Sequence, residues 1–441
     1  MKKVLIITYY WPPSGGSGVQ RWVKFCKYLP SLGWKPVIYA PLNPEYTSID
    51  KTLGEDVPRE AIVLKRKIWE PYNAYRRLLG KSSSVDINAL TAGATGGEVN
   101  PISKGKKSFT KKLSLFIRGN CFIPDPRCWW VGPSYRYLKE YLEENPVDVM
   151  VTTGPPHSMH LIGRKLARKT GIPWISDFRD PWTKMYYYKD LELTAWADMR
   201  HHRLEKAVLD ESTRVLAVTP LMREDFQAMT KTPVEMITNG YDEVDFDQVV
   251  EDDGNFNITH TGLFSADGNP EVLWKVLSAR CKADPEFKAK MRLRLVGKSD
   301  AEIIDSIKKA DLEENLLDFG YQSHNTAIRE QKSASILILP LRNDPDYRPI
   351  LPGKLFEYLA AKRPILGIGQ EDGAMARVLN QTGAGVTYDW SNEAAVAKYI
   401  DDSWCKYKDD TLDCNSVGIE QFSRRNLTVK LVALMDSLLD K

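Results

Sequence analysis

The first forty residues change from a strand-like to a helix-like pattern and back. Residues 4–7 form a continuous apolar run, and a loop rich in Pro, Ser and Gly follows at 12–18. Apolar residues recur at helical spacing between 19 and 32, and Gly33 stands where a helix C-cap glycine is expected. A second apolar run covers 36–40. The pattern predicts a strand, a glycine-rich loop, a helix and a parallel strand, which is one βαβ unit.

The same rhythm resumes after residue 146 and runs through the rest of the chain. In the first half it predicts strands at 147–152, 174–176, 214–218 and 234–237, with helices at 158–170 and 221–229. In the second half it predicts strands at 257–260, 292–296, 316–319, 335–339 and 364–367, with helices at 354–361 and 421–439. Two alternating halves predict an α/β protein with two Rossmann-like, doubly wound domains that face each other across a cleft.

Three segments interrupt this rhythm. Residues 239–256 are acidic and irregular, which is typical of an interdomain linker, so we predict domains of residues 1–240 and 241–420. Residues 81–105 are mostly Ser, Gly, Thr and Asn and predict a surface loop. Residues 106–118 predict a short basic amphipathic helix, which is either a solvated face or a contact with a membrane surface.

Composition narrows the class of protein. A chain of 441 residues fits two domains, and 43% hydrophobic with 27% charged residues is typical of a globular protein in water. The net charge of +3 gives no support to a nucleic-acid-binding protein. Six scattered cysteines without a CxxC pair indicate reduced thiols, and no segment reaches 18 uninterrupted apolar residues. We therefore expect a cytoplasmic protein.

Three loops that follow predicted strands carry candidate chemistry. Gly15 and Gly16 lie between a strand and a helix start, where backbone N–H groups suit an anion. The loop does not match GxGxxG, which disfavours a nicotinamide dinucleotide. His157 follows two prolines, and Arg179 stands between Asp177 and Asp180, just before Trp182. Such residues orient hydroxyls or a phosphate, and the alternatives are a tight turn and a self-satisfied Arg–Asp pair.

A fourth candidate precedes the predicted helix at 354–361. Gly353 and Lys354 at the helix start would receive a diphosphate, and the Glu357 carboxylate could accept both ribose hydroxyls. The alternative is a capped helix with an exposed ion pair. Asp344 and Asp346 form a DxD triplet, which we interpret as a polar loop rather than a metal site.

In combination these segments resemble the family 4-type, two-domain (GT-B) glycosyltransferases along nearly the whole chain. The resemblance is carried by Pro-Pro-x-Gly-Gly at 12–16, Ile-Pro-Asp-Pro-Arg at 123–127, Gly-Pro-Pro at 154–156, Asp-Phe-Arg-Asp-Pro-Trp at 177–182, Thr-Asn-Gly-Tyr-Asp at 238–242 and Lys-Leu-Phe-Glu-Tyr at 354–358. It implies a retaining, metal-independent transfer without a cofactor, from a UDP- or GDP-linked sugar. It also implies that the C-terminal domain binds the donor, that the N-terminal domain binds the acceptor, and that the final helix, 421–441, joins the N-terminal domain. Glu357 would hold the ribose.

The chain departs from the family pattern at three places. The first Glu of the E-x7-E motif falls on Pro349, and a family His near the sugar falls on Arg179. The loop at 262–268 lacks the Arg and Lys that neutralise the diphosphate in relatives. Because a diphosphate leaving group needs positive charge, we expect substitutes from Lys298, Arg342, Arg348 and Lys354.

We therefore expect glycosyl transfer to a saccharide or lipid-linked saccharide, in surface polysaccharide or glycoconjugate assembly. Lys354, Lys298, Arg342, Gly353 and Glu357 would bind the donor, with Gly15 and Gly16 bordering its diphosphate. Arg179, Asp180 and His157 would line the sugar and the acceptor. If the acceptor is lipid-linked, residues 106–118 would dock the protein at the inner face of the membrane. The alternatives are a nucleotide-sugar epimerase and a non-catalytic partner subunit that kept the fold.

Overall fold

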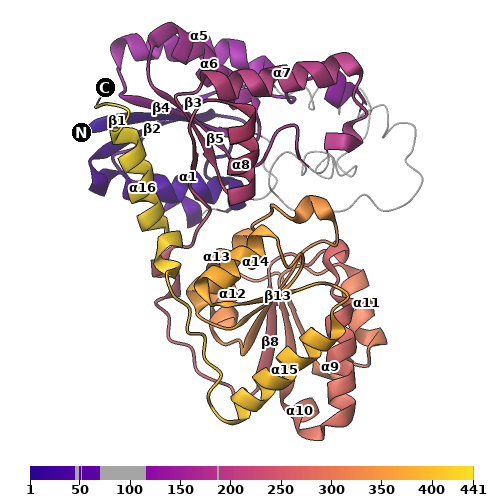
Figure 1. Ribbon diagram of the computed structural model, residues 1–441. Helices are drawn as coiled ribbons and strands as arrows, with labels where there is room; N and C mark the ends of the chain where they lie inside the picture. Colours follow the sequence, from indigo (N-terminus) through magenta and orange to yellow (C-terminus); the bar gives the residue numbers. More distant parts are fainter. Residues whose placement is uncertain (45–48, 51, 70–115, 186–187, 441) are drawn as a thin grey trace. The chain divides into compact units, whose positions relative to one another are not determined.

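The computed structural model describes residues 1–44, 49–50, 52–69, 116–185 and 188–440 (Figure 1). The chain divides into two compact units. Unit 1 is Met1–Thr238 with Arg425–Lys441, and unit 2 is Asn239–Arg424. The predicted loop at 81–105 and all but the last three residues of the predicted basic helix at 106–118 lie outside the described residues.

Unit 1 is built on a seven-stranded sheet in the order β3-β2-β1-β4-β5-β6-β7. Every pairing in it is parallel; for example, Val4 of β1 aligns with Pro36 on one side and with Val149 on the other. The strands are β1 (Lys2–Ile7), β2 (Trp34–Pro41), β3 (Ile62–Arg66), β4 (Val149–Gly154), β5 (Trp174–Phe178), β6 (Arg214–Ala217) and β7 (Val234–Met236). Among the described residues, the helices of this unit include α1 (Ser17–Tyr28), α5 (Val131–Glu144), α6 (Ser158–Thr170), α7 (Ala195–Glu211) and α8 (Pro220–Met229).

The last helix of the chain, α16 (Arg424–Asp436), packs on unit 1. Its Leu431 and Met435 are fully buried in the same core as the central strands, and Figure 1 shows it, in yellow, beside the sheet of this unit. The Asp436 carboxylate accepts hydrogen bonds from Lys2 Nζ at 2.7 Å and from Trp34 Nε1 at 3.1 Å. Unit 1 therefore contains both ends of the described chain.

Unit 2 repeats the topology with six parallel strands in the order β10-β9-β8-β11-β12-β13. The strands are β8 (Phe256–Thr261), β9 (Met291–Val296), β10 (Leu316–Gly320), β11 (Ile336–Pro340), β12 (Ile365–Ile368) and β13 (Gly385–Tyr388). The helices are α9 (Glu271–Ala283), α10 (Pro285–Lys290), α11 (Ala301–Lys309), α12 (His324–Lys332), α13 (Gly353–Ala361), α14 (Ala374–Thr382) and α15 (Glu393–Lys408). Two doubly wound parallel sheets, one in each unit, confirm the predicted α/β class with two Rossmann-like domains.

In each unit the first strand lies between the second and the fourth strand of that unit. This arrangement creates a topological switch point, beside β1 in unit 1 and beside β8 in unit 2. Ligands of open α/β sheets bind outside the carboxyl ends of the strands at such a point. We therefore expect a ligand site of either unit to lie at the carboxyl ends of its strands.

Two local predictions from the sequence need correction. The helix predicted to run to residue 32 ends at Tyr28, because Pro30 has no N–H to donate, and a 3₁₀ turn covers Pro30–Leu32 before Gly33 takes a φ of 84°. The acidic segment 239–256 is not a free linker. Its Tyr241 is buried in a core of unit 2, and Lys332 Nζ donates to the Phe246 carbonyl at 2.6 Å.

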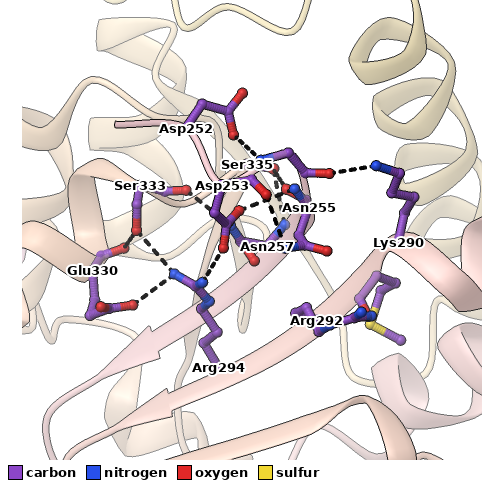
Figure 2. Close-up of polar contacts among 12 residues, drawn as sticks. Asp252, Asp253, Asn255, Asn257, Lys290, Arg292, Arg294, Glu330, Ser333 and Ser335 are labelled. Atoms are coloured by element: carbon purple, nitrogen blue, oxygen red, sulfur yellow. Dashed lines mark hydrogen bonds and ion pairs between the residues drawn. The ribbon is translucent and has the colours of Figure 1, made fainter. Parts of the chain in front are cut away.

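The amino ends of β8, β9 and β11 are tied together by a polar network (Figure 2). The Arg294 guanidinium contacts the Asp253 carboxylate and, at 2.8 Å, the Glu330 carboxylate. The Asn257 side-chain amide donates to the same Asp253 carboxylate at 2.9 Å, and the Asn257 backbone donates to Ser335 Oγ at 3.0 Å. We call Asp253, Asn257, Arg294, Glu330 and Ser335 the amino-edge network.

Candidate functional site

At the carboxyl edge of unit 2, two loops touch backbone to backbone. A Cβ atom on Gly297, whose φ is 134°, would lie 2.2 Å from the Gly262 carbonyl oxygen, so a side chain at this position would collide with the loop after β8. Phe264 N donates to the Lys298 carbonyl at 2.9 Å. The loops after β8 and β9 therefore form one surface, on which Lys298 is exposed.

Lys354 is held against this surface from the first turn of α13. Its ammonium donates to the Leu263 carbonyl at 2.6 Å and lies 3.3 Å from His260 Nε2. A Cβ atom on Gly262 would lie 2.7 Å from Lys354 Cε, so the glycine makes room for the lysine stem. Burial, and secondarily the Lys354 charge, hold the pKa of His260 well below its usual value. His260 is thus a neutral acceptor for the lysine.

The other predicted cations divide into two groups. Arg342, after β11, forms an ion pair with Asp267 of the 262–268 loop, and its guanidinium lies 5.0 Å from the Tyr347 ring centroid. Lys298, Arg342 and Lys354 therefore come together around this loop. Arg348 instead pairs with Asp372 at 2.7 Å. Asp344 of the DxD triplet accepts a hydrogen bond from Asp346 N at 2.9 Å, which is a turn contact.

Glu357 lies one turn beyond Lys354 on the same helix. Its Oε2 accepts a hydrogen bond from Gln331 Nε2 at 3.0 Å, and the same amide nitrogen donates to Thr261 Oγ1 at 3.0 Å. Tyr358 OH accepts from Thr261 N at 2.9 Å. These contacts hold the carboxylate at the carboxyl end of β8, beside the switch point.

In unit 1, the corresponding edge starts with the glycine loop before α1. Gly16 is the N-cap of this helix with φ 94° and ψ 165°, and no side chain caps it. A Cβ atom on Gly18 would lie 2.2 Å from Arg179 Nη1, so the arginine packs directly on the start of α1. Arg179 Nη2 also donates to the Pro155 carbonyl. The structure thus brings Arg179 to the loop that contains Gly15 and Gly16.

Asp177 and Asp180, the two carboxylates near Arg179 in the sequence, differ in their partners and in the direction of their pKa shifts. Asp177 does not pair with Arg179: Asp177 accepts hydrogen bonds from Arg21 at 2.9 and 3.2 Å, from Trp22 Nε1 at 2.8 Å and from Thr153 Oγ1 at 2.9 Å. Burial opposes ionisation of Asp177, but Arg21 overcomes it and holds the pKa below its usual value. Burial raises the pKa of Asp180, against the effect of Arg179. Asp177 is therefore structural, and Asp180 stays with the candidate site.

His157 stands at the N-cap position directly before α6, but its side chain does not cap the helix. The cap is Asp125, which accepts from Ser158 N and Ser158 Oγ, each at 2.8 Å. The His157 ring stacks on Trp182 at 4.8 Å between centroids, so this face of the tryptophan is covered by the histidine. Burial is the main reason that the pKa of His157 lies well below its usual range, and His160 and Arg179 lower it further.

The sequence of residues 121–240 matches the model of the Glycosyl transferase 4-like domain. This segment of the chain is therefore similar to glycosyl transferase 4-like domains. It contains His157, Arg179 and Asp180, whereas unit 2 lies almost wholly outside the match. Together with the two sheets, the match confirms the resemblance to family 4-like glycosyltransferases of the GT-B fold. No curated protein matches the chain in sequence.

Solved structures of low sequence identity have a similar fold along the length of the chain. A glycosyltransferase from Rickettsia africae is 15% identical with a TM-score of 0.61, over 99% of this chain and 98% of that one. Anabaena HepE in complex with UDP and glucose is 11% identical with a TM-score of 0.61, over 99% and 100%. Sucrose-phosphate synthase from Thermosynechococcus elongatus is 13% identical with a TM-score of 0.61, over 100% of both chains. These likenesses show the fold.

Two residues that shape these sites, Arg21 in unit 1 and His260 in unit 2, were missed from the sequence. Arg21 lies 156 positions from Asp177 and reads as a polar residue of an amphipathic helix, so no spacing rule joins them. His260 was assigned only to a strand, although a histidine at the carboxyl end of a buried strand is a usable signal. Within the described residues, no cluster of three or more His, Cys, Asp or Glu could hold a metal ion, and no helix has the length and apolarity to cross a membrane.

Proposed function

We propose that this chain is a retaining glycosyltransferase that moves a sugar from a nucleotide-sugar donor to a saccharide or lipid-linked saccharide, in surface polysaccharide or glycoconjugate biosynthesis. The observation that carries the proposal is the grouping of Lys298, Lys354 and Glu357 at the switch point of unit 2. HepE, which has this fold, is solved in complex with UDP-glucose, and this supports a nucleotide-sugar donor for the present chain.

The donor diphosphate would lie at the start of α13, beginning at Gly353, with Lys354 and Lys298 offsetting its charge. Glu357 would accept hydrogen bonds from the ribose hydroxyls through the carboxylate that Gln331 orients. Arg342 would contribute if it exchanged its Asp267 partner for a phosphate. These cations replace the Arg and Lys that the 262–268 loop lacks, and we propose that the reaction needs no metal ion.

The acceptor would bind to unit 1 beside Arg179, Asp180 and His157, next to the loop that contains Gly15 and Gly16. His157 is held neutral by burial and accepts or donates a hydrogen bond without adding charge. In a retaining transfer, the departing phosphate itself takes the proton of the incoming hydroxyl, so the account needs no protein nucleophile. For a lipid-linked acceptor, the basic segment 106–118 would dock a cytoplasmic protein on an anionic membrane.

Thermal unfolding in the presence of UDP, GDP, ADP, CMP or NAD tests the donor site. A ligand at about 100 times its dissociation constant stabilises a protein by roughly 2.7 kcal/mol. We expect one nucleoside diphosphate to raise the unfolding temperature and Glu357→Ala to abolish the shift. A shift with none of the five, or an equal shift in the variant, would remove the donor assignment.

Pro349 and the uncharged start of the 262–268 loop favour one alternative, a non-catalytic partner subunit with the same fold. This alternative predicts no turnover of the donor whatever acceptor is offered. A nucleotide-sugar epimerase would instead convert the donor to its epimer in the absence of an acceptor. Analysis of the products formed from the nucleotide sugar, with and without an acceptor, distinguishes glycosyl transfer, epimerisation and the absence of turnover.

A further inference from the structure

A pocket opens in unit 1 beside the end of β4 and the first half of α7. Its walls include Pro155 and Pro156 after β4, Trp182 after β5, and the Tyr188 and His201 rings. Arg118 and His157 also line it. The hollow is open to solvent, and its empty space, open solvent included, is about 510 Å³. Rings and prolines thus form most of a wall that a ligand can reach from solvent.

Most polar side chains of this wall already have protein partners. Trp182 Nε1 donates to His201 Nδ1 at 3.0 Å, which leaves His201 Nε2 to donate to the Gly119 carbonyl at 3.3 Å. Tyr188 OH donates to Asp198 at 2.9 Å. The Asp125 carboxylate accepts from Ser158 and from Arg127 N. These groups are therefore committed to holding the wall rather than to binding a ligand.

Arg118 is the exception. Its side chain is half-buried at the pocket, and within the described part of the chain it has no hydrogen bond or ion pair. The His157 ring also has a nitrogen without a hydrogen-bond partner, but the ring is neutral, so it neither repels nor attracts an anion strongly. A guanidinium that is partly removed from water and lacks a carboxylate partner favours a bidentate anion such as a phosphate or a carboxylate.

We propose that this pocket binds the acceptor and that the acceptor carries an anionic group, which Arg118 binds while a sugar ring lies on the aromatic and proline wall. This inference rests on the proposed glycosyl transfer and adds the chemical class of the acceptor to it. The anion has two sources with the same chemistry: the phosphate of a glycosyl phosphate, or the carboxylate of an acidic sugar.

Ligand-detected NMR on the full chain tests the proposal with three probes: glucose 1-phosphate, glucuronic acid and methyl glucoside. We expect at least one anionic probe to bind more tightly than neutral methyl glucoside. We expect Arg118→Gln to weaken that binding about tenfold or more, because hydrogen bonds to a charged group are lost. Preference for glucose 1-phosphate would identify a phosphate-bearing acceptor, and preference for glucuronic acid an acidic sugar.

Two further variants separate a binding role from a structural one. Arg136→Gln removes an exposed arginine from α5 of the same unit and serves as the matched control, with unchanged binding expected. Arg118→Lys keeps the charge and should recover part of the affinity. Equal binding of all three probes, no binding of any, or the same loss in Arg136→Gln would overturn the proposal.

This outcome is independent of the donor test. If Arg118→Gln leaves anion binding unchanged while the nucleoside diphosphate still stabilises the protein, only the acceptor inference fails. If no nucleotide binds at all, the proposed function fails even where the pocket binds anionic sugars. The two results therefore identify which part of the account is wrong.

Discussion

The carboxyl edges of the two sheets differ in charge, although the first six strands of each unit follow the same order. In unit 1 the strongest charges at this edge neutralise each other: Arg21 and Asp177 form an ion pair in which both side chains are 0% exposed. In unit 2 Lys298 is exposed, and Lys354 donates to a backbone carbonyl and a neutral imidazole. The same topology thus supports two kinds of edge. At the edge of unit 1 the charges of Arg21 and Asp177 are paired inside the protein, and at the edge of unit 2 positive charge stays at the surface. The second suits a diphosphate, and the first suits a saccharide.

The largest effect is expected from Asp177→Ala in unit 1. The substitution leaves the Arg21 guanidinium buried without its carboxylate, and removing one partner of a buried pair costs about 3–5 kcal/mol. The change in the free energy of unfolding of unit 1 is measured by hydrogen exchange at increasing denaturant concentration. The double variant Arg21→Met with Asp177→Ala should recover part of the loss. A loss below about 1 kcal/mol would mean that the pair is not a structural element of this edge.

The second prediction concerns how the stability of each unit changes as the pH falls. Burial, as the largest cause, lowers the pKa of His157, of His160 to about 3, and of His201, all in unit 1. In unit 2, burial lowers the pKa of His260. A histidine whose folded-state pKa is depressed is neutral when folded and binds a proton when unfolded, so its contribution to stability is complete above the unfolded pKa near 6.5 and is lost as the pH falls below it.

We therefore expect unit 1 to lose more stability than unit 2 between about pH 7 and about pH 5.5. Each fully shifted histidine contributes a loss of about 1 kcal/mol over this interval. Hydrogen exchange at the two pH values resolves the two units. His160→Gln should reduce the loss in unit 1 by about one histidine's share. Equal losses in both units would contradict the expected difference.

The third prediction concerns binding of the nucleoside diphosphate at the carboxyl edge of unit 2. Lys354→Met should weaken binding of the nucleoside diphosphate about 10- to 100-fold, because a charge-assisted hydrogen bond to phosphate is lost. The unfolding free energy should change by less than about 1 kcal/mol, since the lysine is only half-buried. Titration calorimetry measures the affinity. Unchanged affinity would place the diphosphate elsewhere.

The smallest effect is expected at the opposite end of the same sheet. Arg294→Gln breaks two partly exposed ion pairs of the amino-edge network and should reduce the unfolding free energy by about 1–2 kcal/mol (Figure 2). Because this network lies at the amino ends of the strands, nucleotide affinity should be unchanged. This variant is the matched control for Lys354→Met. A tenfold loss of nucleotide affinity in Arg294→Gln would show that affinity falls with the stability of unit 2, and not because a residue of the binding site was changed.

The sequence predicted those parts of the fold that depend on local pattern. The buried strands read as continuous apolar runs, and helices such as α6 show a clear apolar face, so their positions were predicted closely. Helix α7 was not predicted, because its buried face includes His201 and Glu205 and does not look apolar in the sequence. β3 was also missed, since three of its five residues are exposed and none is fully buried.

The candidate site was predicted in part. Lys354 and Glu357 were found because a helix start and a family motif coincide there. The role of Arg21, which holds Asp177 away from Arg179, depends on a contact between residues far apart in the chain. The cover that His157 places on Trp182 depends on packing in the same way. No pattern within a single segment encodes either contact.

The measurement that most directly tests the donor assignment is hydrogen exchange of the full chain with and without the nucleoside diphosphate that stabilises it. The account predicts slower exchange in the 262–268 loop, at Gly297–Lys298 and in the first turn of α13, with little change in the amino-edge network. Protection confined to unit 1, or spread evenly over both units, would contradict the assignment of the donor to the carboxyl edge of unit 2.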